Sequence, residues 1–205
     1  MTNPLRRQTL GDLLHRSAAR HPDKPAVTCG ETHWTYAEFD YLCDRLAAGM
    51  AQRGIGKGDA VAVLARNSHG FAALRFALAR LGAVLVPINL MLKAEEVAYI
   101  LRHAGARTLA MDSGLSELGK AAAVLDTLIK QFIWLPSEEA SMPTSGTVSF
   151  DELASSTAAI PEIELNGSDL AQIVYTSGTE SLPKGAMLTH DAVMWQYVSC
   201  VVDAN

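Results

Sequence analysis

The sequence has few cysteines, no long apolar run and no excess of positive charge. Its three cysteines, Cys29, Cys43 and Cys200, are odd in number and widely spaced, which favours a reducing cytoplasm over a disulfide framework. No stretch reaches the roughly 18 apolar residues of a membrane-spanning helix. The net charge is −5 at pH 7, so electrostatics give no reason to expect nucleic-acid binding. We therefore expect a cytoplasmic protein with no membrane span.

The histidines do not have the spacing of a metal site. His15, His21, His33, His69 and His103 are scattered along the chain, so we expect no metal held by the protein alone. The chain has 205 residues, of which 49% are apolar and 19% charged. That composition is typical of a globular protein with a real core, and the length suits one domain or a large part of one.

Buried strands alternate with amphipathic helices along most of the sequence. Residues 60–65 and 83–86 are apolar without alternation, which is typical of strands buried on both faces of a parallel sheet. This order predicts an α/β fold, a layered sheet with helices on both faces. The expected strands are 26–29, 33–36, 60–65, 83–86, 107–111, 132–135 and 169–175. The expected helices are 10–21, 35–54, 67–82, 93–104, 116–128 and one that Thr189 caps, with 137–148 a surface loop.

Residue types at the boundaries sharpen some of these expectations. Thr35 followed by Glu38 is the pattern of a capping box. Asn67 or Ser68 is expected to cap the next helix, and we favour a capping role for Asn67. Gly82 is placed to end that helix.

A stretch rich in threonine, serine and glycine follows the apolar run 171–175. Gly178 lets backbone N–H groups turn inward without a Cβ in the way, and with nearby hydroxyls they suit phosphate oxygens. Lys184 adds a positive charge, and Pro183 before it restricts the backbone. We therefore predict a loop that holds nucleotide phosphates, formed by Thr176, Ser177, Gly178, Thr179, Glu180, Ser181, Lys184 and Gly185. An ordinary polar turn between a strand and a helix uses the same residue types, so this alternative interpretation of the segment remains open.

The spacing of this loop differs from that of the common phosphate loop. That motif has four residues between its glycines, followed by lysine and then serine or threonine. Here six residues lie between Gly178 and Gly185, Lys184 precedes the second glycine, and Ala186 follows it. The chemistry is similar, but the order of residues belongs to another design.

The run Tyr-Thr-Ser-Gly-Thr at 175–179, followed by Pro-Lys-Gly at 183–185, resembles the phosphate-binding signature of the adenylate-forming enzymes. These are the acyl-CoA synthetases, the adenylation domains of peptide synthetases and the luciferases. Glu180-Ser181 stands where the family usually has Thr-Gly, and we interpret it as the mark of a subfamily. Weaker similarities to the family's motifs lie at 34–39, 54–67, 81–89 and 188–190, so the resemblance covers essentially the whole chain.

The resemblance implies a partial N-terminal domain of an ATP-dependent acid–thiol ligase. Residues 1–168 would form an N-terminal α/β subdomain, and 169–205 would begin a second one. The implied reaction activates a carboxylic acid, in our interpretation a fatty acid, as an acyl-adenylate and transfers it to coenzyme A. ATP and Mg²⁺ are implied as well. The parts that hold adenine and ribose, and the C-terminal domain, would be missing, so we expect this chain alone to be inactive.

Two alternatives remain open. One is an adenylation domain that loads an amino or aryl acid onto a carrier protein. The other is a non-catalytic domain that only folds and associates, with a homodimer possible through apolar surface that a missing subdomain would cover.

Single residues can be weighed in the same way. Lys184 is the candidate catalytic residue. Glu180 is either a neighbour of Mg²⁺ or simply solvated. His190 begins the last helix, where we interpret it as a surface or packing residue. Trp34 and Trp134 are expected in the core, together with Trp195, which could alternatively line a pocket.

Overall fold

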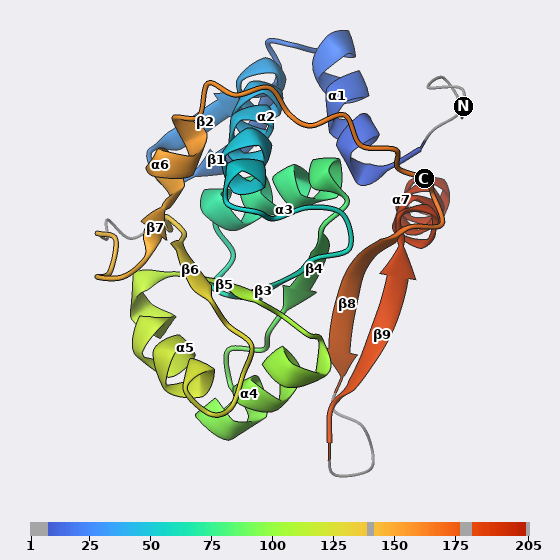
Figure 1. Cartoon of the computed structure of the whole chain (residues 1–205). Helices are drawn as coiled ribbons and strands as arrows, with labels where there is room; N and C mark the ends of the chain where they lie inside the picture. Colours follow the sequence, from blue (N-terminus) through green and yellow to red (C-terminus); the bar gives the residue numbers. More distant parts are fainter. Residues whose placement is uncertain (1–7, 139–141, 177–181, 204–205) are drawn as a thin grey trace.

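The computed structural model describes residues 8–138, 142–176 and 182–203 and centres on a seven-stranded sheet (Figure 1). The strand order is β7-β6-β5-β3-β4-β8-β9, with β9 antiparallel to β8 and every other pair parallel. The strands are β3 (Ala60–Leu64), β4 (Val84–Pro87), β5 (Thr108–Met111), β6 (Gln131–Trp134), β7 (Val148–Ser149), β8 (Leu170–Thr176) and β9 (Lys184–Thr189). A separate hairpin pairs β1 (Pro25–Cys29) with β2 (Thr32–Thr35).

Helices cover both faces of the sheet, as the sequence predicts (Figure 1). They are α1 (Leu10–Arg20), α2 (Tyr36–Gln52), α3 (His69–Leu81), α4 (Ala94–His103), α5 (Ser116–Ala123), α6 (Phe150–Ala154) and α7 (His190–Asp203). Alternate residues of β3 divide between the two layers because successive side chains of a strand point to opposite faces. Val61 and Val63 pack with α2 and α3, whereas Ala62 and Leu64 pack with α4 and α5.

The predicted helix boundaries are confirmed in several places. Thr35 and Glu38 form a reciprocal capping box, with the Thr35 amide 2.8 Å from the Glu38 carboxylate. Gly82 ends α3 in the left-handed region at φ 64°. The cap of α3 is Ser68, whose hydroxyl accepts from the Phe71 amide at 3.1 Å, so the capping role for Asn67 was wrong.

Other expectations differ from the structure. The helix predicted over 116–128 ends at Ala123, because Asp126 adopts a positive φ of 54° that a helix cannot continue through. Strand β9 replaces part of the expected loop, and the residues just after the predicted loop 137–148 form the short helix α6. The domain boundary at residue 168 stays a prediction, and β8 pairs with β4 within the same sheet.

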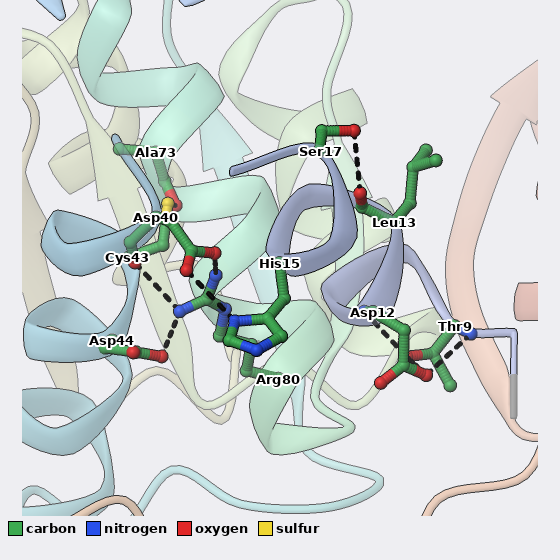
Figure 2. A network of polar contacts seen from close by, with 10 residues as sticks. All are labelled: Thr9, Asp12, Leu13, His15, Ser17, Asp40, Cys43, Asp44, Ala73 and Arg80. Atoms are coloured by element: carbon green, nitrogen blue, oxygen red, sulfur yellow. Dashed lines mark hydrogen bonds and ion pairs between the residues drawn. The ribbon is translucent and has the colours of Figure 1, made fainter. Parts of the chain in front are cut away.

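A buried arginine joins the first three helices (Figure 2). Arg80 of α3 has a side-chain exposure of 9% and forms ion pairs with Asp40 and Asp44 of α2. One of its guanidinium nitrogens also donates to the Asp40 carbonyl at 2.9 Å. His15 of α1 lies 3.1 Å from the Asp40 carboxylate. The network therefore links α1, α2 and α3 above the sheet.

Candidate phosphate-binding hairpin

The predicted phosphate loop lies at the end of a β-hairpin made by β8 and β9. Tyr175 pairs with Gly185 and Thr176 pairs with Lys184, so the two ends of the loop face each other across the ladder. Both Thr176 and Lys184 are exposed. The hairpin extends beyond the rest of the sheet and lies beside α4 (Figure 1). A cation and a hydroxyl are thus held together where the loop begins and ends.

The structure places some of the predicted site residues and not others. Thr176, Lys184 and Gly185 are brought together by the hairpin. The remaining predicted residues, Ser177, Gly178, Thr179, Glu180 and Ser181, lie outside the described residues. Their roles therefore stay predictions.

The return strand β9 was not predicted from the sequence. Residues 186–188 are Ala-Met-Leu, and a run of three residues is too short for its periodicity to indicate a strand. They also come just before a clear helix cap. The cap itself was predicted correctly, because the Thr189 hydroxyl accepts from the Ala192 amide at 3.2 Å. The last residues of the motif, Lys184 and Gly185, therefore belong to strand β9, and their pairing with β8 joins the two ends of the loop.

Gly185 leaves room for the ring of Tyr175, its cross-strand partner, to lie over β9. A Cβ on Gly185 would lie 2.8 Å from the Ile173 methyl Cγ2 and 3.1 Å from Cζ of Tyr175. Those distances are shorter than van der Waals contact, so a larger residue would displace the tyrosine ring. The glycine of the Pro-Lys-Gly segment thus has a packing role in addition to its predicted place in the loop.

Tyr175 is in turn held by α4. Its hydroxyl oxygen lies 2.7 Å from Nδ1 of His103, and the two rings meet edge to face with centroids 5.7 Å apart. The ring of Tyr99 stacks on the His103 imidazole, with their centroids 5.5 Å apart. Burial raises the pKa of Tyr175, which keeps its hydroxyl protonated. Sequence reasoning missed His103 and Tyr99, although a spacing of four residues places both on one side of a helix.

The other end of the hairpin is fixed by charged and buried groups. Lys57 lies 2.8 Å from the Asp169 carboxylate, and this hydrogen bond lowers the pKa of Asp169. The Asp169 carbonyl accepts from the His190 amide at 3.1 Å. His190 is fully buried, and its Nδ1 accepts from the Leu10 amide at 3.3 Å. The packing interpretation of His190 is confirmed, and burial lowers the pKa of its imidazole.

A second concentration of cations lies elsewhere in the fold. A hollow of about 590 Å³ is lined by Arg53, Arg107 and Lys130 beside the ends of α2 and α4. Positive side chains near helix C-termini are favourable because the helix dipole is negative there. These charges therefore have a structural explanation, but the hollow is an alternative to the hairpin as a binding site for an anion.

Metal-ligand clusters and membrane-spanning helices are both absent from the part of the chain that the structure describes. Within residues 8–138, 142–176 and 182–203, no group of three or more histidines, cysteines or carboxylates is arranged to hold a metal ion. Over the same residues, no helix is long and apolar enough to cross a membrane. The hairpin places the hydroxyl-bearing Thr176 and the cationic Lys184 at the two ends of the predicted loop, and such a pair suits an anionic, phosphate-bearing ligand.

A parallel α/β sheet followed by a segment rich in threonine, serine and glycine is typical of proteins that bind nucleotides, and the fold and the sequence motif indicate this class. The particular family follows from comparison with known sequences. The family model described as AMP-binding enzyme matches residues 14–205, and the chain belongs to this family. The adenylate-forming resemblance of the motif is thereby confirmed.

Individual relatives are similar over nearly all of the chain. A long-chain-fatty-acid–CoA ligase, FadD13 of Mycobacterium tuberculosis, is 35% identical over 91% of this chain and 36% of its own length. A 2,3-dihydroxybenzoate-AMP ligase of Bacillus subtilis is 34% identical over 90% of this chain and 34% of its own length. The crystal structure of the N-terminal domain of FACL13 from Mycobacterium tuberculosis superimposes with a TM-score of 0.76 and 31% identity, covering 91% of this chain and 46% of that one.

The relatives are much longer than this chain. It spans about a third of the length of the two curated relatives and about half of the solved N-terminal domain. The fold of the N-terminal portion is therefore shared, and the fold class predicted from sequence is confirmed.

Proposed function

We propose that the whole protein activates a carboxylic acid with ATP and passes the acyl group to coenzyme A. A carboxylate oxygen attacks the α-phosphorus of ATP, the bond to the bridging oxygen breaks, and pyrophosphate leaves with the bonding electrons. The thiolate of coenzyme A then attacks the acyl carbon and releases AMP. The observation that carries this proposal is the pairing of Thr176 with Lys184, which closes a hydroxyl-rich loop at the hairpin of an AMP-binding family member.

The loop has a defined task in this reaction. Its hydroxyl and N–H groups hold the β- and γ-phosphates, and Lys184 balances the charge that grows on the departing pyrophosphate. Placed donors and a fixed cation of this kind stabilise a transition state electrostatically. Mg²⁺ shares the phosphate charge when it is bound. Mg²⁺ is commonly held by one or two carboxylates together with substrate phosphates, so we propose that it arrives with the nucleotide.

We propose a fatty acid as the substrate. We also propose that the protein acts in the cytoplasm. Similarity to a fatty-acid–CoA ligase supports the choice of acid. Similarity to a 2,3-dihydroxybenzoate-AMP ligase supports the alternative, in which an aryl or amino acid is loaded onto a carrier protein. The two are separated by the acid that supports exchange of labelled pyrophosphate into ATP.

The exchange assay uses the complete reading frame and this chain side by side, each with ATP, Mg²⁺, labelled pyrophosphate and a panel of fatty, aryl and amino acids. We expect exchange by the complete protein to depend on fatty acids, and we expect none by this chain alone. Positioning an acid against the α-phosphate needs contacts to the nucleotide beyond the loop, and misplacement by about 1 Å can cost on the order of 100-fold in rate. Exchange by neither protein with any acid would contradict the proposed function.

We also propose that this chain on its own pairs into a homodimer. Several large apolar side chains of β9 and α7 are exposed, and exposed apolar surface favours association. They are Met187, Trp195, Val198, Val201 and Val202, which we call the α7 patch.

A further inference from the structure

The tip of the hairpin receives little support from the rest of the sheet. Strand β8 is paired with β4 at Gln172, opposite Leu85, whereas its pairing with β9 continues as far as Thr176. The last residues of β8 therefore extend past the registered pair with β4. A loop carried on such a tip needs another contact to hold its position relative to the domain.

Helix α4 supplies that contact. Ile173 and Tyr175 lie on one face of β8, because alternate residues of a strand share a face, and both pack against the apolar cluster that α4 contributes to. The hydroxyl of Tyr175 reaches Nδ1 of His103 at 2.7 Å, a length typical of a strong hydrogen bond. Tyr99 stacks on His103 with an interplanar angle of 22° and limits how the imidazole can turn.

The strand opposite is shaped for the same contact. Gly185 is the cross-strand partner of Tyr175, and a Cβ there would strike the tyrosine ring at 3.1 Å. The ring can therefore lie across β9 and still reach α4. Thr176 and Lys184, the two residues at the base of the loop, come directly after Tyr175 and directly before Gly185. The ring therefore lies beside the residues next to both ends of the loop.

We propose that Tyr175 and His103 are positioning residues for the phosphate-binding loop, acting through their shared hydrogen bond. Neither residue is assigned contact with the ligand. The proposal rests on the proposed function for the identity of the ligand, while the mechanical link between α4 and the hairpin stands on the contacts themselves.

The test measures two quantities for this chain. The first is the dissociation constant for magnesium pyrophosphate, from titration calorimetry. The second is the rate of hydrogen–deuterium exchange in peptides that cover β9, without ligand. The variants are Tyr175→Phe, His103→Leu and the double variant. Tyr41→Phe is the matched control, because Tyr41 is 63% exposed on α2 and loses the same hydroxyl.

Each single variant is expected to bind about 3- to 10-fold more weakly, the range that loss of one hydrogen bond produces. Exchange in β9 should become faster in both, and the double variant should be no worse than either single, because partners in one contact are not additive. His103→Asn, which can place an amide where Nδ1 lies, should recover part of the affinity, whereas a purely structural role for the ring would not be restored. The control should match the unaltered chain.

Failure of the inference is distinct from failure of the proposed function. If the unaltered chain binds pyrophosphate and the single variants bind equally well, the positioning role is overturned and the function stands. If losses in the double variant equal the sum of the single losses, the residues act independently and the proposal is wrong. If no chain binds pyrophosphate, phosphate binding by the isolated hairpin is contradicted, and exchange in β9 alone decides the link to α4: unchanged rates overturn it.

Discussion

Lys184 and Thr176 are paired across the β8–β9 hairpin, so a cation and a hydroxyl stand at the two ends of the loop. The motif placed a cation and a hydroxyl at either end of one loop. The backbone pairing brings the same two residues opposite each other. Seven residues separate them in sequence, so their position opposite each other depends on the register of β8 and β9, and a slip of one residue would part them.

The first prediction concerns Lys184 in the complete protein. Lys184→Ala should slow adenylate formation by about 10- to 1000-fold, the order expected when one charge-stabilising group is lost. The measurement is the rate of acid-dependent pyrophosphate exchange. Lys24→Ala is the control, because Lys24 is exposed and lies just before β1, which pairs with β2 outside the seven-stranded sheet. Unchanged kinetics in Lys184→Ala would remove this lysine from the site.

The second prediction concerns the pH dependence of His190. The carboxylates of Asp12, Asp169 and Asp191 and the ammonium of Lys57 act on its imidazole, and burial still lowers its pKa below the ordinary 6.5. As pH falls through about 6.5, the unfolded chain gains a proton at His190 that the folded chain does not. Folded stability should therefore be full above this pH and decline below it.

Urea unfolding between pH 7.5 and pH 5.5 measures this decline. His190→Asn, which keeps an acceptor for the Leu10 amide but does not titrate, should show a smaller decline than the unaltered chain. His69 should account for part of the decline that remains in His190→Asn, because burial lowers the pKa of His69 as well. His33→Asn, at an exposed site, serves as control. Identical slopes for His190→Asn and the unaltered chain would contradict the assignment.

At the scale of elements, most strands and helices could be predicted because their signals are local. Capping residues, a terminating glycine and unbroken apolar strands mark α2, α3, β3 and β4 without reference to the rest of the chain. Strand β9 and the early end of α5 could not be predicted in this way. The first depends on a partner strand across a loop, and the second on Asp126 adopting a positive φ.

The candidate site residues also differ in whether their signal in the sequence is local. Thr176, Lys184 and Gly185 could be predicted because a long motif names them. His103 could not, because its significance comes from a contact with Tyr175, which is 72 residues away in the chain. Residues that act through a tertiary contact carry no local mark in a single sequence.

The third prediction concerns the joint between α1, α2 and α3. Arg80→Met should destabilise the chain by about 3 kcal/mol, because it leaves the Asp40 carboxylate, with 13% side-chain exposure, without its cation. The measurement is the free energy of unfolding in urea. Arg53→Met breaks the exposed ion pair with Glu152 and should cost at most about 1 kcal/mol. Equal effects of the two substitutions would show that the Arg80 network adds nothing to the packing.

The whole molecule presents the α7 patch beside the hairpin, and the fourth prediction concerns its association. Trp195 is 69% exposed on α7, so the expectation that it lies in the core was wrong. Trp195→Glu places a charge there and should shift the chain from dimer to monomer in sedimentation equilibrium, since desolvating an unpaired charge is costly. Met91→Glu alters a side chain that is 87% exposed before α4 and should leave association unchanged. A monomer in the unaltered chain would contradict the proposed dimer.

The central claim is that the β8–β9 hairpin binds phosphates, and the most direct measurement is a hydrogen–deuterium exchange footprint of this chain. The fifth prediction is that magnesium pyrophosphate slows exchange in peptides covering 170–190 and leaves peptides around Arg53, Arg107 and Lys130 unchanged. Lys184→Ala should abolish the slowing. Protection confined to the hollow that those three cations line, or no protection at the hairpin at saturating pyrophosphate, would contradict the account.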